Sequence, residues 1–173
     1  QREPGEEAVR YIDIGSIDRA TKTIGELEHV TGENAPARAR QWVRAGDVLV
    51  SMTRPNLNAV ALVPPALDGT VASTGFDVLR PVGVLPKWVF SRVRSHAFVV
   101  DVCDGLQGVV YPAIRPHDVR QHELPVAPLP EQHRIVAKVD ELMALCDELE
   151  QQQTHSNAAH ETLVETFLSM LTS

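Results

Sequence analysis

The stretch LPVAPLPEQHRIVAKVDEL, residues 124–142, divides the chain into two parts of different character. Its three prolines interrupt regular structure, because proline has no backbone N–H to donate and restricts the residue before it. Beyond the third proline, neither glycine nor proline occurs up to the end of the chain. We therefore predict a domain over residues 1–128, followed by one long helix over residues 129–173.

The predicted helix carries a heptad repeat, in which the inward-facing positions follow one another at alternating spacings of four and three residues. A heptad specifies a narrow seam that fits a partner helix, rather than the broad stripe of a helix lying on a sheet. At 1.5 Å per residue the helix is roughly 55 to 60 Å long, too long to lie wholly on a domain of about 130 residues. We therefore predict coiled-coil pairing with another helix. The positions of this heptad seam are Ile135, Val139, Leu142, Cys146, Leu149, Gln153, Ser156, His160, Leu163, Phe167 and Met170.

Before the prolines, short extended segments alternate with turns that contain glycine or proline. β-Branched or alternating apolar residues predict strands over residues 9–14, 47–52, 60–63 and 71–79. Residues 86–102 place apolar side chains at helical spacing after a proline suited to a first turn, which predicts one helix packed on the sheet. The expected fold class is α+β: a small mixed domain followed by a long C-terminal coiled-coil helix.

The composition is that of an ordinary globular protein, with 43% hydrophobic and 23% charged residues. No apolar run approaches the roughly 18 to 20 residues of a membrane span, and the polar opening residues lack the regions of a signal peptide. Cys103 and Cys146 form no metal-type pair, so neither a disulfide framework nor a zinc site is expected. These features favour a cytoplasmic location without a membrane role.

The formal net charge of −7 argues at first against a nucleic-acid partner, because lysine and arginine supply most non-specific affinity for DNA. The acidity is concentrated near the C-terminus, however. Residues 129–173 hold 2 basic and 8 acidic residues, whereas residues 1–128 hold 14 basic and 15 acidic ones. Most basic residues of the first part are arginines, which form bidentate hydrogen bonds with guanine or phosphate. The charge distribution is therefore compatible with DNA binding by the first part.

Four stretches resemble, in order and spacing, the half-repeat of the specificity subunits of type I restriction-modification systems. They read YIDIGSID, AGDVLVSMTRPNLNAVALV, STGFDVLRP and GVVYPAIRPHDVRQHELPVAPLPEQHRIVAKVDELMALCDELE. In many such subunits an L-P-x-x-P-x-x-E-Q-x-x-I segment joins a recognition domain to a spacer helix. This chain has that segment at Leu124, Pro125, Pro128, Glu131, Gln132 and Ile135.

The resemblance implies a non-catalytic subunit that places partner subunits on a bipartite double-stranded DNA target. Those partners are methyltransferase subunits, which methylate adenine N6 with S-adenosylmethionine, and translocating endonuclease subunits. An intact subunit of this family usually has two recognition domains and two spacer helices that run in opposite directions. This chain has one of each, which implies half a subunit and a homodimer formed through its C-terminal helix.

The residues themselves carry no recognisable catalytic apparatus. The only Pro-Pro pair, Pro64 and Pro65, lacks the flanking polar and aromatic residues of an amino-methyltransferase loop, and no glycine-rich nucleotide loop occurs. None of Lys22, Lys87 and Lys138 follows an acidic residue at the spacing common in nucleases. We therefore expect neither enzymatic activity nor a cofactor or metal ion.

The first group of candidate DNA contacts follows a predicted strand. Thr53, Arg54, Asn56 and Asn58 lie together there, and arginine can pair with guanine while asparagine can pair with adenine. A polar turn in which each asparagine satisfies its own backbone explains the same residues equally well.

Further candidates lie on either side of this turn. Arg38, Arg40 and Arg44 surround Trp42 and could contact phosphates, although a solvated loop is as good an interpretation, with Trp42 in the core. The remaining candidates, in and after a glycine-bearing loop, are Gln107, Tyr111 and Arg115.

Polar residues near the boundary are interpreted more simply. His117 and His122 are taken as surface residues, because no acidic or cysteine companion stands at a metal-binding spacing. Glu131 and Gln132 are interpreted as first-turn residues that the helix dipole favours. Two other functions stay open: a coiled-coil interaction module that does not bind DNA sequence-specifically, and a small hydrolase with a dispersed site.

Overall fold

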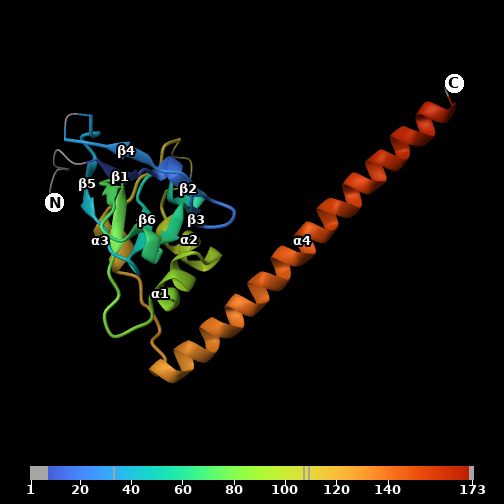
Figure 1. Cartoon of the computed structure of the whole chain (residues 1–173). Coiled ribbons are helices and arrows are strands. Elements are labelled where there is room, and N and C mark those ends of the chain that lie inside the picture. Colours follow the sequence, from blue (N-terminus) through green and yellow to red (C-terminus); the bar gives the residue numbers. More distant parts are fainter. Residues whose placement is uncertain (1–7, 33, 107, 109, 172–173) are drawn as a thin grey trace. The chain divides into compact units, whose positions relative to one another are not determined.

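A computed structural model of the chain describes residues 8–32, 34–106, 108 and 110–171, and the side chains among these up to residue 162 (Figure 1). Two compact units emerge, one up to Gln132 and one from His133 onward. The α+β fold class and the long C-terminal helix are both confirmed. The helices are α1 (Pro86–Val93), α2 (His96–Val102), α3 (Pro116–Arg120) and α4 (Leu129–Leu171).

The first unit holds all the strands that the structure describes. A four-stranded sheet has the order β4-β1-β8-β5, a three-stranded antiparallel sheet has the order β7-β6-β9, and β2 pairs with β3. In the larger sheet β1 and β8 run parallel, while the other neighbours are antiparallel. The strands are β1 (Val9–Ile12), β2 (Ile17–Asp18), β3 (Thr23–Ile24), β4 (Glu28–Val30), β5 (Ala39–Trp42), β6 (Val48–Ser51), β7 (Val60–Leu62), β8 (Val71–Ser73) and β9 (Phe76–Leu79).

Strand β6 is buried on both faces, which explains its three consecutive apolar residues, Val48, Leu49 and Val50. Leu49 belongs to a core cluster that also holds Ile12 and Phe76. Its neighbours Val48 and Val50 point to the opposite face and pack with residues of α1 and α2, among them Phe98. Because successive side chains of a strand alternate between faces, this one strand connects the two apolar clusters.

The segment predicted as a single strand over residues 71–79 is two strands in different sheets. β8 pairs with β1 and β5, whereas β9 pairs with β6. The chain changes sheet at Gly75, where an added Cβ would lie 2.8 Å from the Ile14 side chain. An alternating pattern shows which residues are inward, but it does not show that the chain crosses from one sheet to the next.

The helix predicted over residues 86–102 is likewise two helices. α1 ends before Arg94, and the Ser95 side chain caps α2 by accepting a hydrogen bond from the Phe98 backbone N–H at 3.2 Å. Serine favours such a cap because its hydroxyl satisfies a donor that has no intrahelical partner. Phe98 and Val93 still reach the same apolar cluster, so the helical spacing correctly indicated the buried side.

Two buried carboxylates anchor the three-stranded sheet. Asp47 precedes β6 and accepts hydrogen bonds from Arg80 Nε at 2.8 Å and from the Arg44 backbone N–H at 2.8 Å. Asp77, in β9, accepts from Arg120 through both Nε and Nη2. These hydrogen bonds raise the pKa of Arg80 and of Arg120. Bidentate pairing offsets the cost of burying the two carboxylates.

Gln132 has a second role that its interpretation as a first-turn residue missed. Its side chain is only 1% exposed, accepts a hydrogen bond from the Leu85 backbone N–H at 2.9 Å and donates one to the Ala127 carbonyl at 2.8 Å. The side chain therefore joins the loop before α1 to the proline-rich segment that leads into α4. Glu131 fits its interpretation as a first-turn residue better, because it lies in the first turn of α4 and is only half-buried.

Within the described part of the chain, no helix is both long enough and apolar enough for a membrane span. The same residues contain no group of three or more His, Cys, Asp or Glu side chains that could hold a metal ion.

Candidate nucleic-acid interface

Residues 52–54 and residues 112–114, two segments far apart in the sequence, pair to form the base of the candidate interface. Thr53 bridges Ala113 in antiparallel fashion, and the Arg54 backbone N–H donates to the Pro112 carbonyl at 2.8 Å. A third hydrogen bond joins the Ile114 backbone N–H to the Met52 carbonyl at 2.9 Å. This pairing extends the end of β6 and holds the turn after it against the segment that follows the glycine-bearing loop.

The turn itself is strained at both ends. Arg54 has φ of 49° and Asn58 has φ of 46°, and a short 3-10 helix, Pro55–Leu57, lies between them. The left-handed conformation is unfavourable for a residue with a Cβ, and such residues often cluster at functional sites. We name this segment the 54–58 turn.

Arg54 is stacked on Tyr111 at the surface. The guanidinium carbon lies 4.8 Å from the centroid of the Tyr111 ring, in the range of a cation–π contact. Tyr111 is 70% exposed and Arg54 is also exposed. The stack therefore restricts the arginine side chain without burying its hydrogen-bond donors, which leaves them available to a ligand.

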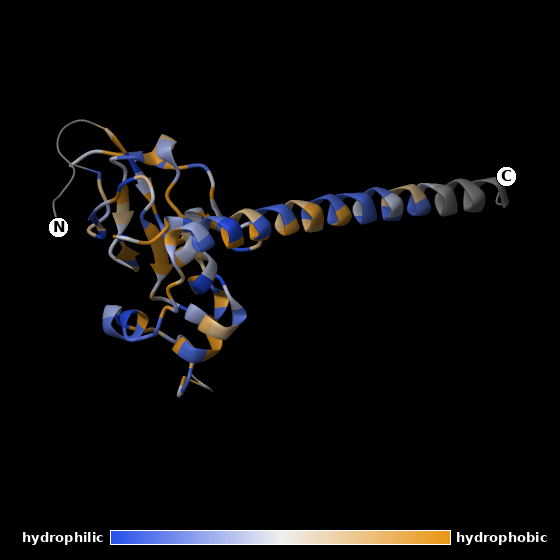
Figure 2. Ribbon diagram, turned by 90° about the horizontal axis from the view of Figure 1, so that it is seen from below, coloured by the Kyte–Doolittle hydropathy of each residue, from blue (hydrophilic) through white to orange (hydrophobic). Residues whose placement is uncertain are grey.

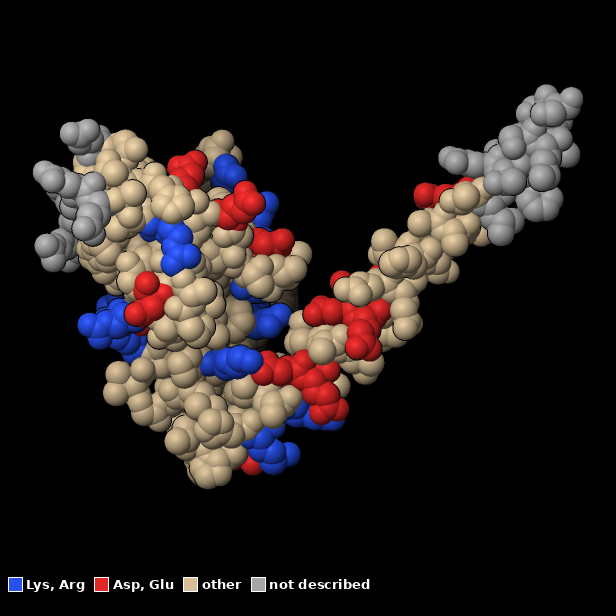
Figure 3. All heavy atoms as spheres, in the orientation of Figure 1, with Lys and Arg blue, Asp and Glu red and all other residues tan. Residues whose placement is uncertain are grey.

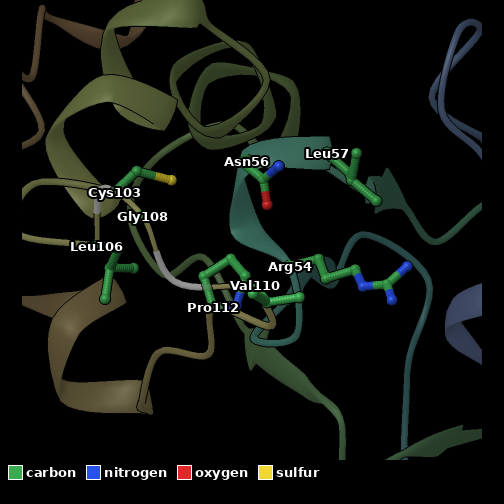
Figure 4. A pocket seen from close by; sticks show the side chains of 8 residues that line it. All are labelled: Arg54, Asn56, Leu57, Cys103, Leu106, Gly108, Val110 and Pro112. Atoms are coloured by element: carbon green, nitrogen blue, oxygen red, sulfur yellow. The ribbon is translucent and has the colours of Figure 1, made fainter.

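An open pocket of about 490 Å³ lies beside the turn (Figure 4). Figure 4 shows the Asn56 amide directed over the pocket, whereas the Arg54 guanidinium extends away from Cys103 and Leu106. Burial raises the pKa of the Cys103 thiol. The lining residues are Arg54, Asn56, Leu57, Cys103, Leu106, Gly108, Val110 and Pro112.

Asn58 differs from the other candidates because its side chain is engaged inside the domain. Its Nδ2 donates to the Arg94 carbonyl at 2.9 Å, and its own carbonyl accepts from Lys22 Nζ at 2.7 Å. Its Oδ1 is buried and has no partner among the residues that the structure describes. The amide thus fixes the turn to the end of α1, and its predicted contact with a base stays a prediction.

The arginines around Trp42 lie on a different sheet from the 54–58 turn. Arg40 is in β5 and its Nε donates to the Ala37 carbonyl at 2.6 Å, while Arg38 precedes that strand and is exposed. Arg44 is exposed after the strand. The prediction that Trp42 belongs to the core is wrong. Its side chain is 38% exposed, because it is the last residue of an edge strand.

The candidates beyond the glycine-bearing loop have mixed outcomes. Gln107 lies outside the described residues. Arg115 precedes α3 and is 83% exposed, with its Nε 3.7 Å from Asp118 Oδ2. The structure therefore brings Thr53, Arg54, Asn56 and Tyr111 together, and it does not add Arg38 or Arg40 to that group.

His122 is half-buried, so its assignment to the surface is wrong. Its ring centroid lies 5.6 Å from that of Phe98 in an edge-to-face arrangement, and its Nε2 is buried without a partner among the described atoms. His117 is exposed, as expected.

The heptad seam is largely uncovered in the single chain. Leu142 is 50% exposed and Leu149 is 56% exposed, and Cys146 and Gln153 are exposed as well. Ile135 and Val139 are half-buried. The side chains of Leu163 and Phe167 lie outside the described residues, although the backbone there is helical.

The apolar side of α4 is broader than the predicted seam. Leu145 is 51% exposed and Met143 is 37% exposed, and neither belongs to the heptad seam. Figure 2 shows hydrophobic positions interleaved with hydrophilic ones along the described helix. Acidic side chains also gather on α4, whereas lysine and arginine are spread over the visible face of the first unit (Figure 3).

The fold and site define a two-part protein: an α+β domain with an arginine stacked at its surface, and one extended helix with exposed apolar residues. In sequence and fold the chain is a relative of the specificity subunits of type I restriction-modification systems, as the sequence motifs predicted. No family model matches the chain.

Three known proteins carry this relationship. The specificity subunit of the type I restriction enzyme EcoEI from Escherichia coli is 51% identical over 133 residues, which cover 73% of this chain and 22% of that protein. A chain from a structural study of assembly and conformational transition in a type I restriction-modification system matches 99% of this chain and 46% of its own length, with TM-score 0.89 and 35% identity. The HsdS subunit of Thermoanaerobacter tengcongensis matches 94% of this chain and 42% of its own length, with TM-score 0.82 and 37% identity. The chain thus spans less than half the length of each relative.

Proposed function

We propose that the chain is a DNA-specificity module that binds double-stranded DNA sequence-specifically and performs no chemistry itself. The observation that carries this proposal is the match to a type I restriction-modification chain over 99% of this sequence. The Arg54–Tyr111 stack supports it, because a pre-positioned and accessible guanidinium suits bidentate contact with guanine. The chemistry belongs to partner subunits: the module directs adenine methylation by methyltransferase subunits and restriction by endonuclease subunits.

Binding selection tests the DNA-binding part of the proposal. The purified chain is mixed with a library of random duplexes, and the bound fraction is amplified and sequenced over several rounds. We expect enrichment of a defined motif that then binds more tightly than random duplex. Equal binding of all sequences, or none, would instead favour the coiled-coil interaction module that does not read DNA.

The non-catalytic part has its own measurement. Transfer of methyl groups from labelled S-adenosylmethionine to duplex DNA is assayed with the chain alone, with a methyltransferase subunit alone and with both together. We expect transfer above the methyltransferase background only in the mixture. Transfer by the chain alone would contradict a purely directing role.

The uncovered side of α4 supports a second element of the proposal, a homodimer. Leu142 and Leu149 are about half exposed, and an antiparallel pair centred between Gln152 and Gln153 would cover them. A polar residue near the centre of a coiled coil commonly fixes its register. Two-fold pairing predicts that the selected motif consists of two inverted half-sites separated by an unread spacer.

Light scattering at micromolar concentration measures this pairing directly. We expect twice the chain mass of 19.0 kDa. A monomer at every accessible concentration, or a selected motif that lacks inverted symmetry, would overturn the homodimer.

A further inference from the structure

The 54–58 turn lies in the loop between the antiparallel strands β6 and β7, and tertiary contacts hold it at both ends. At its first end the Arg54 backbone N–H donates to the Pro112 carbonyl at 2.8 Å. At its second end the Asn58 carbonyl accepts from Lys22 Nζ at 2.7 Å, and Asn58 Nδ2 donates to the Arg94 carbonyl at 2.9 Å. The β2–β3 loop and the end of α1 therefore fix the residue that closes the turn.

Hydrogen bonds inside the turn connect these two ends. The Leu57 backbone N–H donates to the Arg54 carbonyl at 2.9 Å, and the Asn58 backbone N–H donates to the Pro55 carbonyl at 2.9 Å. Pro55 is buried, and its ring restricts its own φ. A displacement of Asn58 is therefore passed on to the backbone from which the Arg54 side chain extends.

Several unfavourable features meet in this one turn. Arg54 and Asn58 both adopt the left-handed backbone conformation, with φ of 49° and 46°. Asn58 Oδ1 is buried without a partner among the described residues, and burial lowers the pKa of Lys22. Such features persist only where the surrounding structure imposes them, and they cluster at binding sites. The same turn carries the Arg54 guanidinium that is stacked on Tyr111.

We propose that Asn58, held by Lys22, is a positioning residue that sets the direction of the Arg54 guanidinium and thereby the sequence preference. This inference rests on the proposed DNA binding, which it makes more specific. Tyr111 restricts the end of the arginine side chain, while Asn58 fixes the backbone at its start. Bidentate pairing with a base needs both donors in one geometry, so losing the positioning residue should reduce discrimination more than general affinity for DNA.

Single-base substitutions in the selected duplex test this role. The base that Arg54 reads is the one whose substitution weakens the wild type but not Arg54→Ala. The factor by which that substitution weakens binding, which we call the Arg54 penalty, is measured for every variant by fluorescence anisotropy. Thermal unfolding of each variant accompanies the titrations.

Two variants release the turn and one serves as a control. Asn58→Gly removes the amide donor and the unpartnered oxygen, and glycine adopts the left-handed conformation without strain. Lys22→Met removes the donor to the Asn58 carbonyl and keeps an apolar stem. Asn34→Gly is the matched control, because Asn34 Oδ1 accepts a hydrogen bond from the Thr31 backbone N–H within its own turn, after the edge strand β4.

The wild type should show an Arg54 penalty of about 5- to 150-fold, the range of one bidentate base contact. In Asn58→Gly this penalty should fall to less than about a third, while affinity for random duplex changes less than about twofold. Its thermal unfolding should stay close to that of the wild type, because relief of backbone strain offsets the lost hydrogen bond. Lys22→Met should lower the penalty in the same way, and Asn34→Gly should keep it. If Asn58→Gly does not fold, Lys22→Met decides the question.

Four outcomes would overturn the positioning role and leave the proposed function standing. An unchanged Arg54 penalty in the folded Asn58 and Lys22 variants would make their contacts purely structural, and an equal fall in Asn34→Gly would make the effect unspecific. Discrimination lost at a different base would assign Asn58 to direct base contact. A selected motif in which Arg54→Ala discriminates every base as the wild type does would show that Arg54 reads none. A wild-type chain that prefers no sequence would overturn the proposed function itself.

Discussion

The two units of the chain differ in how far their apolar side chains are buried. In the first unit Ile12 and Phe76 are at most 1% exposed, and β6 is covered on both faces. In the helix from His133 onward, Leu142 and Leu149 remain about half exposed. The first unit therefore buries these apolar side chains within itself. The apolar side chains of the heptad seam become buried only when another helix covers them.

Charge follows the same division. The first unit pairs its buried carboxylates Asp47 and Asp77 with Arg80 and Arg120, and other arginines reach the surface. The helical part is acidic, with 8 acidic and 2 basic residues over residues 129–173. An acidic helix repels phosphate, so any DNA contact made by this chain is expected in the first unit.

The largest effect expected is on the core of the first unit. Phe76→Ala removes a side chain that is 1% exposed and should lower the free energy of unfolding by about 3–5 kcal/mol through lost transfer energy and a residual cavity. Chemical denaturation followed by tryptophan fluorescence measures this unit alone, because both tryptophans, Trp42 and Trp88, lie in it. Leu149→Ala is the control, and its midpoint should match the wild type. A similar loss in both variants would mean that the two units unfold together.

The next effect concerns pairing of the helix. Leu149→Asp should weaken the homodimer by about 3 kcal/mol, because each copy would place a carboxylate against apolar neighbours. Sedimentation or light scattering over a dilution series measures the change. Glu148→Gln lies beside this position but outside the heptad seam, and it should leave the dimer intact. Equal masses for the wild type and Leu149→Asp would place the dimer contact elsewhere.

A comparison of the two units also explains what the sequence could predict. The helix follows from local rules, namely the absence of glycine and proline and the heptad spacing, so its existence was correctly predicted. In the first unit local patterns indicated which residues are buried but not their pairing. Residues 71–79 were therefore predicted as one strand, although Gly75 lets the chain change sheet.

The candidate site was also only partly predictable, because local patterns indicate residue types but not which segments pair. Arg54 and Asn56 were indicated by residue type at the end of a strand, and Tyr111 by its loop. The Arg54–Tyr111 stack depends on pairing between segments almost 60 positions apart, which no local pattern contains. No local pattern indicated Lys22 either, because only the fold brings its side chain to the Asn58 carbonyl.

A smaller effect is expected on DNA affinity. Arg54→Ala should weaken binding to the selected duplex by about 1–3 kcal/mol if the guanidinium reads a guanine, with little change for random duplex. Arg115→Ala removes a second exposed arginine that is also a predicted contact, and comparison of the two losses ranks the two arginines. Fluorescence anisotropy at fixed salt measures both. Equal weakening for all sequences would assign Arg54 to phosphate contact, and no change would remove it from the interface.

The smallest expected effect, a difference in thiol reactivity, compares the two units within one molecule. Cys103 is half-buried in the first unit, and burial raises the pKa of its thiol. Cys146 is exposed on the single helix and lies on the heptad seam. Because the thiolate is the reactive species, Cys103 should react slowly with iodoacetamide at pH 8 and faster as the pH rises toward its pKa.

Pairing should change only one of these two rates. In the wild-type dimer the partner helix covers Cys146 and slows its alkylation several-fold relative to the monomeric Leu149→Asp variant, by blocking access to the sulfur. Cys103 should react at the same rate in both proteins, because it lies outside the helix. Mass spectrometry of peptides after timed alkylation gives the two rates separately. Equally fast alkylation of Cys146 in a confirmed dimer would show that the seam is in a different register, and a change at Cys103 would show that pairing of the helix alters the first unit.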